Sequence, residues 1–138
     1  MVGFDKRIYL VDFGLAQCFR DHTTHMHTPL INGLGLVGSI RYTSINSHMG
    51  FQQARRDDLE SLAYTLLFLL QGKVPWQGIA IRNPQCHRAA VLRKKQEICG
   101  LSRDVLPSAV GIFIHYAQSL AFEEDPDYDY ICTTLADL

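Results

Sequence analysis

The sequence predicts a mainly α-helical fold with one short strand near its start and a long loop before the helices. Apolar residues recur at helical spacing in several segments of the later part of the chain. A short run rich in β-branched and aromatic residues lies near the start. The polar stretch that follows has no apolar period, which indicates a loop.

The strand is expected at residues 7–11, which alternate loosely between apolar and polar side chains. The triplet Asp12-Phe13-Gly14 comes next and predicts a turn. Residues 18–44 are polar, with Pro29 and several glycines among them, and predict a long loop. Loops of this length inside a compact domain are usually functional or disordered.

The clearest helix is expected at residues 57–71, where apolar side chains fall at i, i+3, i+4, i+7, i+8 and i+11. Because most of its remaining positions are also apolar, we expect this helix to be buried at the centre of the fold. Gly72 predicts its C-terminal cap, and Pro75 prevents continuation. Further helices are expected at 86–99, at 110–121 after Pro107, and from Pro126 to the end of the chain.

Composition limits the class of protein. A chain of 138 residues fits one domain with a real core, and its formal net charge of −1 suggests neither a nucleic-acid nor a membrane-surface partner. Four scattered cysteines without a CxxC pair indicate free thiols in a reducing compartment. No secretory signal or membrane-spanning run is visible, so we expect a soluble intracellular protein of the cytoplasm, the nucleus or both.

Five short motifs occur in order along the chain and together carry a family resemblance. The Asp-Phe-Gly triplet lies in Tyr-Leu-Val-Asp-Phe-Gly-Leu-Ala-Gln, and residues 38–46 read Gly-Ser-Ile-Arg-Tyr-Thr-Ser-Ile-Asn, with Ser-Ile-Asn where most kinases have Ala-Pro-Glu. Residues 55–62 read Arg-Arg-Asp-Asp-Leu-Glu-Ser-Leu. Pro-Trp-Gln-Gly at 75–78 and Phe-Glu-Glu-Asp-Pro-Asp-Tyr at 122–128 complete the set. These motifs resemble the casein kinase I family of serine/threonine protein kinases, and the resemblance covers nearly the whole chain in order.

The resemblance implies a kinase C-terminal lobe and a phosphoryl-transfer reaction that uses ATP and magnesium. Asp12 matches the carboxylate that holds magnesium against the β- and γ-phosphates. Phe13 would pack into the lobe, and Gly14 would permit the turn. Val11 matches the residue at the floor of the nucleotide pocket, and we expect it to face an open surface here. An isolated Asp-Phe-Gly would also fit an ordinary turn after a strand.

The resemblance also implies protein substrates that are acidic or already phosphorylated. Ser39 keeps the hydroxyl that shapes the site for the accepting residue. Arg41 matches an arginine of a basic pocket for a substrate phosphate, which suits the two-pronged guanidinium group; a structural ion pair within the loop is the alternative. Leu34 and His87 stand where the family has lysines, so we expect a weakened anion site.

Two carboxylates, Asp57 and Asp58, begin the central helix, where unpaired amides and the helix dipole favour them. By resemblance, Asp58 matches the buried aspartate that ties this helix to the catalytic loop. Its expected role is structural, and if it is buried without that loop it reduces stability.

Three other patterns receive weaker interpretations. The run Gly-Leu-Gly-Leu-Val-Gly at 33–38 fits G-x-G-x-x-G but lacks the strand before it and the helix or hairpin after it, so flexible loop glycines are the better interpretation. His22, His25 and His27 near Asp21 lack metal-ligand spacing, and solvated side chains are favoured over zinc ligands. The basic run 93–95 is read as a solvated helix face, with a docking patch as the minority view.

The sequence has no lysine in a Val-Ala-Ile-Lys-like strand and no His-Arg-Asp catalytic loop. We therefore expect a partial kinase domain over 1–138 without its N-terminal lobe, inactive alone. Its expected parts are the Asp-Phe-Gly segment 12–14, an activation loop at about 15–46 and a helical lobe at about 47–138. An apolar periodic stretch ends the chain, which suggests truncation there too.

Three explanations stay open. The favoured one is a fragment of an active casein-kinase-I-like enzyme. The second is a genuine short product acting as a non-catalytic, pseudokinase-like binding or decoy module. The third is a full-length but divergent kinase. A lobe that exposes its interlobe face is expected to show an apolar patch.

Overall fold

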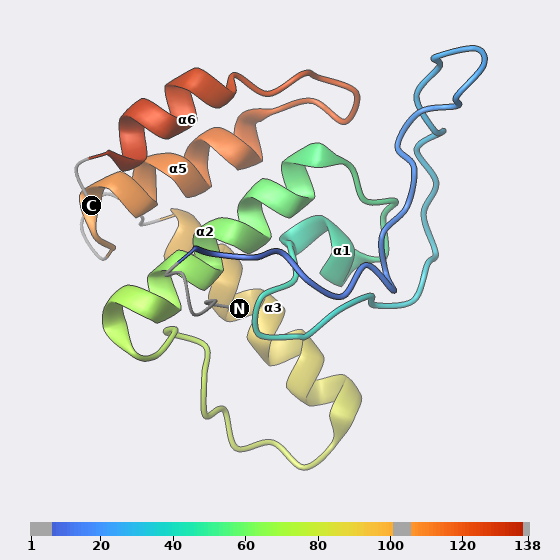
Figure 1. Cartoon of the computed structure of the whole chain (residues 1–138). Helices are drawn as coiled ribbons and strands as arrows, with labels where there is room; N and C mark the ends of the chain where they lie inside the picture. The colour runs from blue at the N-terminus through green and yellow to red at the C-terminus, as the bar shows by residue number, and fades with distance from the viewer. Residues whose placement is uncertain (1–6, 101–105, 137–138) are drawn as a thin grey trace.

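The computed structural model describes residues 7–100 and 106–136, and every regular element in these ranges is a helix. The helices are α1 (Ile45–Met49), α2 (Arg55–Gln71), α3 (Pro84–Gly100), α5 (Ser108–Ser119) and α6 (Tyr128–Leu135). Helix α2 packs against α5 and α1, α5 also contacts α6 and α3, and α1 contacts α3 (Figure 1). The prediction of a mainly helical fold is confirmed.

Helix α2 begins two residues before the predicted start and ends where predicted. The backbone N–H of Ala54 donates to Asp57 Oδ2 over 2.9 Å, so a side chain three residues into the helix satisfies a donor at its N-terminus. At the other end Gly72 has φ 71°, and its N–H donates to the Phe68 carbonyl over 2.8 Å. Glycine tolerates this left-handed geometry, which confirms the predicted cap.

The hydrophobic core lies where α2, α3 and α5 meet. Tyr64 and Trp76 form an edge-to-face pair with ring centroids 4.8 Å apart, and both are almost fully buried. Aliphatic side chains from the three helices surround this pair. Fully buried members of the core include Ala63, Leu67, Val110, Phe113 and Ile114.

The expectation that α2 is buried on all sides is wrong. Its side toward α5 is buried, but Leu62, Leu69 and Leu70 on the other side are 46%, 70% and 48% exposed. Periodicity identified the helix correctly, but it cannot tell which apolar positions receive a neighbour. No element of the described residues covers this side of α2. These three leucines are apolar side chains at the surface of the described lobe.

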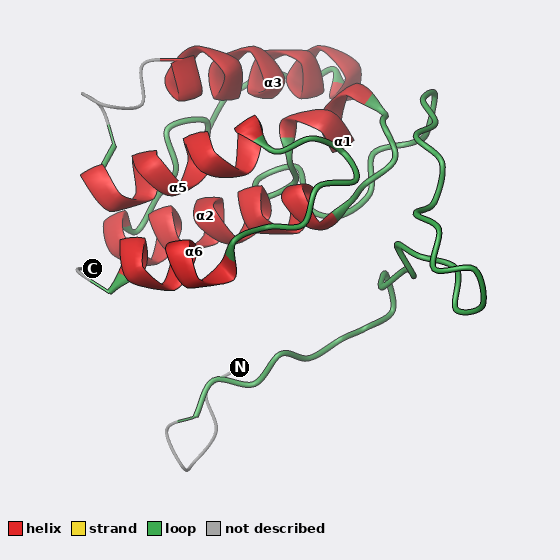
Figure 2. Ribbon diagram, turned by 90° about the horizontal axis from the view of Figure 1, so that it is seen from above, coloured by secondary structure: helices red, strands yellow, loops and turns green. Residues whose placement is uncertain are grey.

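The predicted strand at residues 7–11 does not form in the described chain. Ile8 makes a single isolated bridge, and the segment is extended and exposed. A strand is stabilised by pairing with neighbours and by burying one face, and this segment buries neither face. Segment 7–13 crosses in front of α2 in Figure 1, and Figure 2 shows that it stands apart from the helices.

The other helices match their predicted places with shifted ends. Helix α3 extends the predicted 86–99 by a residue or two at each end, α5 begins directly after Pro107, and α6 begins two residues after Pro126. The short helix α1 was not predicted. Ser44 caps it by accepting the N–H of Ser47 over 3.1 Å. The last two residues of the predicted C-terminal helix lie outside the described ranges.

The loop before α1 contains a tight hairpin at residues 19–28. Arg20 and His27 form an antiparallel bridge, and the N–H groups of Asp21 and Thr28 donate to Met26 and Phe19 carbonyls over 2.9 and 2.8 Å. The hairpin projects away from the helices in both views (Figures 1 and 2). The glycine run 33–38 lies in the loop after it, without the strand or helix that a nucleotide-binding motif needs.

Candidate functional site

The Asp-Phe-Gly triplet forms a turn that leaves its carboxylate at the surface. Asp12 has φ 65°, and its Oδ1 accepts the N–H of Gly14 over 3.3 Å. Asp and Asn adopt this left-handed conformation more readily than most residues because their short side chains bond the local backbone. A Cβ on Gly14 would lie 3.2 Å from Asp12 Oδ1, so glycine leaves room for the carboxylate.

The two residues beside Asp12 are exposed. Val11 faces an open surface, as expected. Phe13 was expected to pack into the lobe, but its side chain is 66% exposed. A ring packs only where other groups surround it, and the extended segment 7–13 stands apart from the helices (Figure 2).

Ser39 and Arg41 lie in the turn that leads to α1. The Ser39 carbonyl accepts the N–H groups of Tyr42 and Thr43 over 2.9 and 3.0 Å, and its side chain is exposed. The Arg41 guanidinium lies 5.7 Å from the ring centroids of both Tyr42 and Phe68. Cation–π contact of this kind holds a guanidinium without neutralising it. None of the ion pairs in the described ranges includes Arg41, so the structural ion pair considered as its alternative role is not seen.

The core anchors the backbone of Arg41. Trp76 Nε1 donates to the Arg41 carbonyl over 2.8 Å, which ties the turn to the Pro-Trp-Gln-Gly segment. The two positions where lysines are replaced lie elsewhere: Leu34 donates its N–H to the Gly50 carbonyl over 2.9 Å, and His87 is in the first turn of α3. Among the described residues, neither Leu34 nor His87 forms a hydrogen bond or ion pair with Arg41.

Asp57, and not Asp58, is the buried carboxylate at the start of α2. Asp57 is fully buried, and its Oδ1 accepts the Ser44 hydroxyl over 2.7 Å and the Asn46 amide over 3.2 Å. Its Oδ2 accepts the N–H of Ala54 over 2.9 Å. Asp57 therefore joins the Ser-Ile-Asn motif to the N-terminus of α2. Sequence analysis missed this role because both aspartates suit a helix N-terminus.

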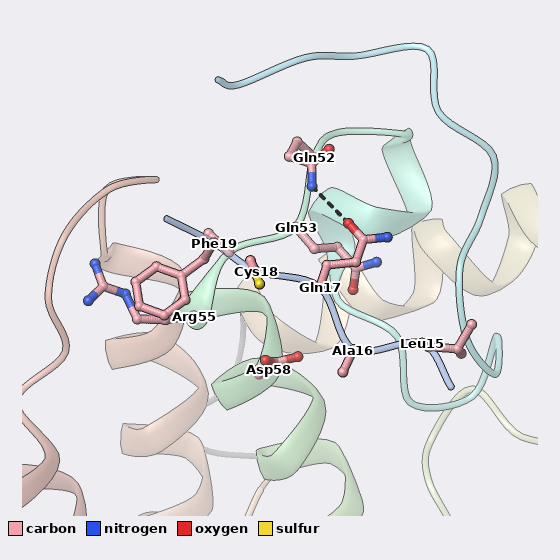
Figure 3. Close-up of a pocket in the computed structure, with 10 residues that line it drawn as sticks. Leu15, Ala16, Gln17, Cys18, Phe19, Gln52, Gln53, Arg55 and Asp58 are labelled. Carbon is pink, nitrogen blue, oxygen red and sulfur yellow. Dashed lines mark hydrogen bonds between the residues drawn. The ribbon is translucent and has the colours of Figure 1, made fainter. Parts of the chain in front are cut away.

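Asp58 is exposed at the side of a pocket of about 170 Å³. Leu15 to Phe19 form one wall, and Gln52, Gln53, Ala54 and Arg55 form the other. Figure 3 shows the Asp58 carboxylate below Gln17, whose Oε1 accepts the Gln52 amide over 3.4 Å. Partial burial and the nearby Asp57 charge raise the pKa of the Asp58 carboxyl.

A second polar cluster, which sequence analysis also missed, lies inside the core. Glu60 Oε1 accepts the Tyr64 hydroxyl, the Ile45 N–H over 3.1 Å and the Gln118 amide over 3.2 Å. Lys95 is fully buried, and its ammonium donates to the Thr43 carbonyl over 2.5 Å. The ammonium also lies 4.8 Å from the Tyr64 ring centroid and 5.2 Å from that of Trp76.

Burial controls the ionisation of this cluster. It raises the pKa of Glu60 and lowers that of Lys95 to about 8, because both charged forms lose hydration. Helical spacing alone gave no sign that these residues meet. Lys95 was read as part of a solvated basic run, which is wrong for this residue. Its neighbour Lys94 is on the outside, paired with Glu97 over 3.0 Å.

The histidines of the hairpin contact different groups and do not form one cluster. His22 Nε2 lies 3.3 Å from Cys18 Sγ, whereas His27 packs edge-on against Phe122 with centroids 4.6 Å apart. Across residues 7–100 and 106–136 no three potential metal ligands come together. Within the same ranges, no helix has the length and apolar character needed to cross a bilayer.

A helical lobe preceded by an Asp-Phe-Gly turn and a long loop is the arrangement of a protein kinase C-terminal lobe. No family model matches the chain. The chain is 41% identical over 133 residues to casein kinase I homolog 3 of Saccharomyces cerevisiae, an alignment that covers 94% of the chain. The chain belongs to the casein kinase I family of protein kinases. It spans about a quarter of the length of that curated relative, since the alignment covers 25% of it.

Proposed function

We propose that the chain is part of a serine/threonine kinase of the casein kinase I type, which transfers the γ-phosphoryl group of ATP to protein hydroxyls. The observation that carries the proposal is the 41% identity to the yeast homologue across 94% of the chain. The proposed parts are the Asp-Phe-Gly segment 12–14, an activation loop at about 15–46 and a helical lobe at about 47–138.

Asp12 is the proposed magnesium ligand. Magnesium in kinases is held by one or two carboxylates together with phosphate oxygens and water. An exposed carboxylate on a fixed turn fits one of those positions, and Asp12 Oδ1 is already oriented by the Gly14 N–H. Bound magnesium would neutralise charge that develops on the transferred phosphoryl group. Val11 is proposed to border the nucleotide, and Phe13 and Gly14 to shape the turn.

Arg41 and Ser39 are proposed to face the protein substrate. The Arg41 guanidinium keeps its charge beside two aromatic rings, and the Trp76 hydrogen bond fixes its backbone. It would donate hydrogen bonds to a phosphate or carboxylate near the accepting hydroxyl. Leu34 and His87 in place of lysines would weaken binding of that anion. Asp58 is proposed as a structural acceptor at the pocket edge.

We further propose that these 138 residues do not transfer phosphate alone. The phosphate-positioning lysine and the catalytic aspartate of the His-Arg-Asp loop do not occur in the sequence. Isothermal titration of the purified chain with magnesium ATP is expected to show no binding at millimolar nucleotide. Saturable binding would contradict this part of the proposal. The cytoplasm and the nucleus are the proposed locations.

The decisive test is the coding sequence upstream of Met1. An in-frame extension with the lysine and the His-Arg-Asp loop is expected, and in the protein it encodes Asp12→Ala should abolish phosphorylation of an acidic peptide. Asp58→Ala should destabilise that longer protein, where the carboxylate would bind the catalytic loop, although it should have little effect in the 138-residue chain. A full-length protein that retains activity after Asp12→Ala would refute the magnesium role.

The second candidate function is a non-catalytic binding or decoy module. The exposed leucines of α2 favour it, because contiguous apolar surface on a folded protein often marks an interaction site. This candidate requires a transcript that begins at Met1 and a soluble protein of 138 residues. Aggregation of the purified chain together with an upstream coding extension would exclude it.

A further inference from the structure

Three segments far apart in the sequence meet at the base of the hairpin 19–28. Arg20 comes from the hairpin, Arg55 from the first turn of α2, and Asp125 from the connection between α5 and α6. Arg20 Nη2 lies 3.0 Å from Asp125 Oδ1, and Arg55 Nη1 donates to the same oxygen. We call these three side chains the Arg20–Arg55–Asp125 clasp.

Additional contacts orient the clasp. Arg55 Nη2 donates to the Glu123 carbonyl over 2.8 Å, so its guanidinium spans the α5–α6 connection. The same guanidinium lies 4.5 Å from the Phe19 ring centroid, and that of Arg20 lies 5.3 Å from it. Two cations therefore converge on one aromatic ring and one carboxylate. The Arg55 hydrogen bond holds the pKa of Asp125 below its usual value.

The hairpin itself is closed by its own hydrogen bonds. Asp21 Oδ1 accepts the N–H groups of Thr23 and Thr24 over 2.9 and 2.7 Å and the Thr24 hydroxyl over 3.0 Å. The bridge between Arg20 and His27 closes the open end. These bonds stay within the hairpin, so it can move as one body without losing them.

The hairpin is attached to the helical lobe at its base, through the clasp and through His27 packing on Phe122. The rest of it projects from the lobe (Figure 1). Asp125 is 71% exposed, so water and salt reach the ionic part of this attachment. The apolar part responds to salt much less. The two parts of the attachment can therefore be separated by experiment.

We propose that the Arg20–Arg55–Asp125 clasp is an ionic latch that sets how often the hairpin 19–28 leaves the helical lobe. The latched state orders the segment that follows the Asp-Phe-Gly turn, and the released state frees the hairpin as a unit. This inference goes beyond the proposed kinase function and does not depend on it, because its readout is the motion of the chain itself.

The test is hydrogen exchange of backbone amides with Asp125→Asn and Arg20→Gln. Exchange is followed separately in peptides from the clasp, from the hairpin and from α5. Either variant is expected to speed exchange of the segment 15–20 by about fivefold, the effect expected from a favourable exposed ion-pair network. Exchange in α5 should stay unchanged, because the lobe remains folded. The double variant should add little to Asp125→Asn, because that single change already removes the Arg20–Asp125 ion pair.

Glu123→Gln is the matched control. It removes a carboxylate from the same connection but keeps the backbone carbonyl that accepts from Arg55. It should leave exchange of segment 15–20 unchanged. In 1 M sodium chloride the Debye length is about 3 Å, so the original chain should approach the Asp125→Asn variant. A Phe122→Leu variant should also loosen the segment, with little dependence on salt.

The latch is refuted if Asp125→Asn exchanges at the original rate, or if Glu123→Gln accelerates exchange equally. Faster exchange throughout α5 would also contradict it, because the effect would then be general unfolding. Loss of catalysis in a longer protein would concern the proposed kinase function alone. The latch and the kinase function are therefore refuted by different results.

Discussion

Replacing Asp57 with alanine should destabilise the protein far more than the same change at its neighbour Asp58. Asp57 is fully buried and accepts hydrogen bonds from the Ser44 hydroxyl, the Asn46 amide and the Ala54 N–H over 2.7, 3.2 and 2.9 Å. Alanine would leave these buried donors without their acceptor. It would also remove the carboxylate 3.8 Å from Arg56 Nε.

The magnitude follows from those contacts. A hydrogen bond to a charged group contributes about 1.5–3 kcal/mol, but bonds that share one carboxylate do not add fully. Removal of one partner from a buried charged network costs about 3–5 kcal/mol, which is our estimate for Asp57→Ala. Since domains unfold with about 5–15 kcal/mol, the variant would be marginally folded. Asp58→Ala should stay within about 0.5 kcal/mol because its side chain is exposed.

The assay is urea unfolding followed by circular dichroism and by the fluorescence of Trp76, the single tryptophan. Asn46→Ala serves as an intermediate step, because it removes one donor to Asp57 Oδ1 and leaves both the carboxylate and the Ser44 cap of α1 in place. If Asp57→Ala costs less than about 1 kcal/mol, or if Asp58→Ala costs as much, the assignment of the buried carboxylate is refuted. Should Asp57→Ala not fold at all, the assignment is tested by whether Asn46→Ala destabilises the protein more than Asp58→Ala does.

Two further changes test the surroundings of α1. Burial, with a smaller contribution from the Lys95 charge, lowers the pKa of His48 from 6.5 to about 4. The folded state then binds fewer protons than the unfolded state between these values, so unfolding free energy should fall by about 3 kcal/mol as pH drops from 6.5 to 4. Urea unfolding at several pH values should show a flatter profile for His48→Gln, and an unchanged slope would contradict this. Gly50→Ala should cost about 1–3 kcal/mol because φ is 85° and the new Cβ would lie 2.7 Å from the Leu34 carbonyl oxygen. Gly100→Ala, at the last residue of α3 with open space around it, should change the unfolding free energy by less than about 0.5 kcal/mol, and equal effects of both changes in thermal unfolding would refute the strain.

Local pattern was sufficient to place most of the helices. The period of α2, its glycine cap and the following Pro75 are set by neighbours within one or two turns, which the sequence displays directly. The family could also be recognised, because its motifs are contiguous short runs. The exact helix ends were harder to predict from the sequence. The start of α2 depends on a hydrogen bond from the Ala54 N–H to Asp57, which apolar periodicity does not reveal.

The prediction of a strand near the start was wrong for a different reason. Residues 7–11 have the residue types of a strand, but such residues stabilise a strand when the rest of the fold covers one of its faces, and this segment is exposed. The same holds for Phe13, whose burial was inferred from the family and whose surroundings in this structure leave it exposed. Propensity describes what a segment can form, not what it meets.

The sequence by itself determined the helical class, the order of the helices, the family and the set of candidate residues from Val11 to Asp58. The tertiary structure decided which carboxylate is buried, which side of α2 lacks a cover, and that Lys95 enters the core near Glu60. Adjacent aspartates differ by about a third of a helical turn, and only packing determines which of them points inward. Burial and pairing depend on neighbours distant in sequence, and those neighbours are known only once the chain has folded.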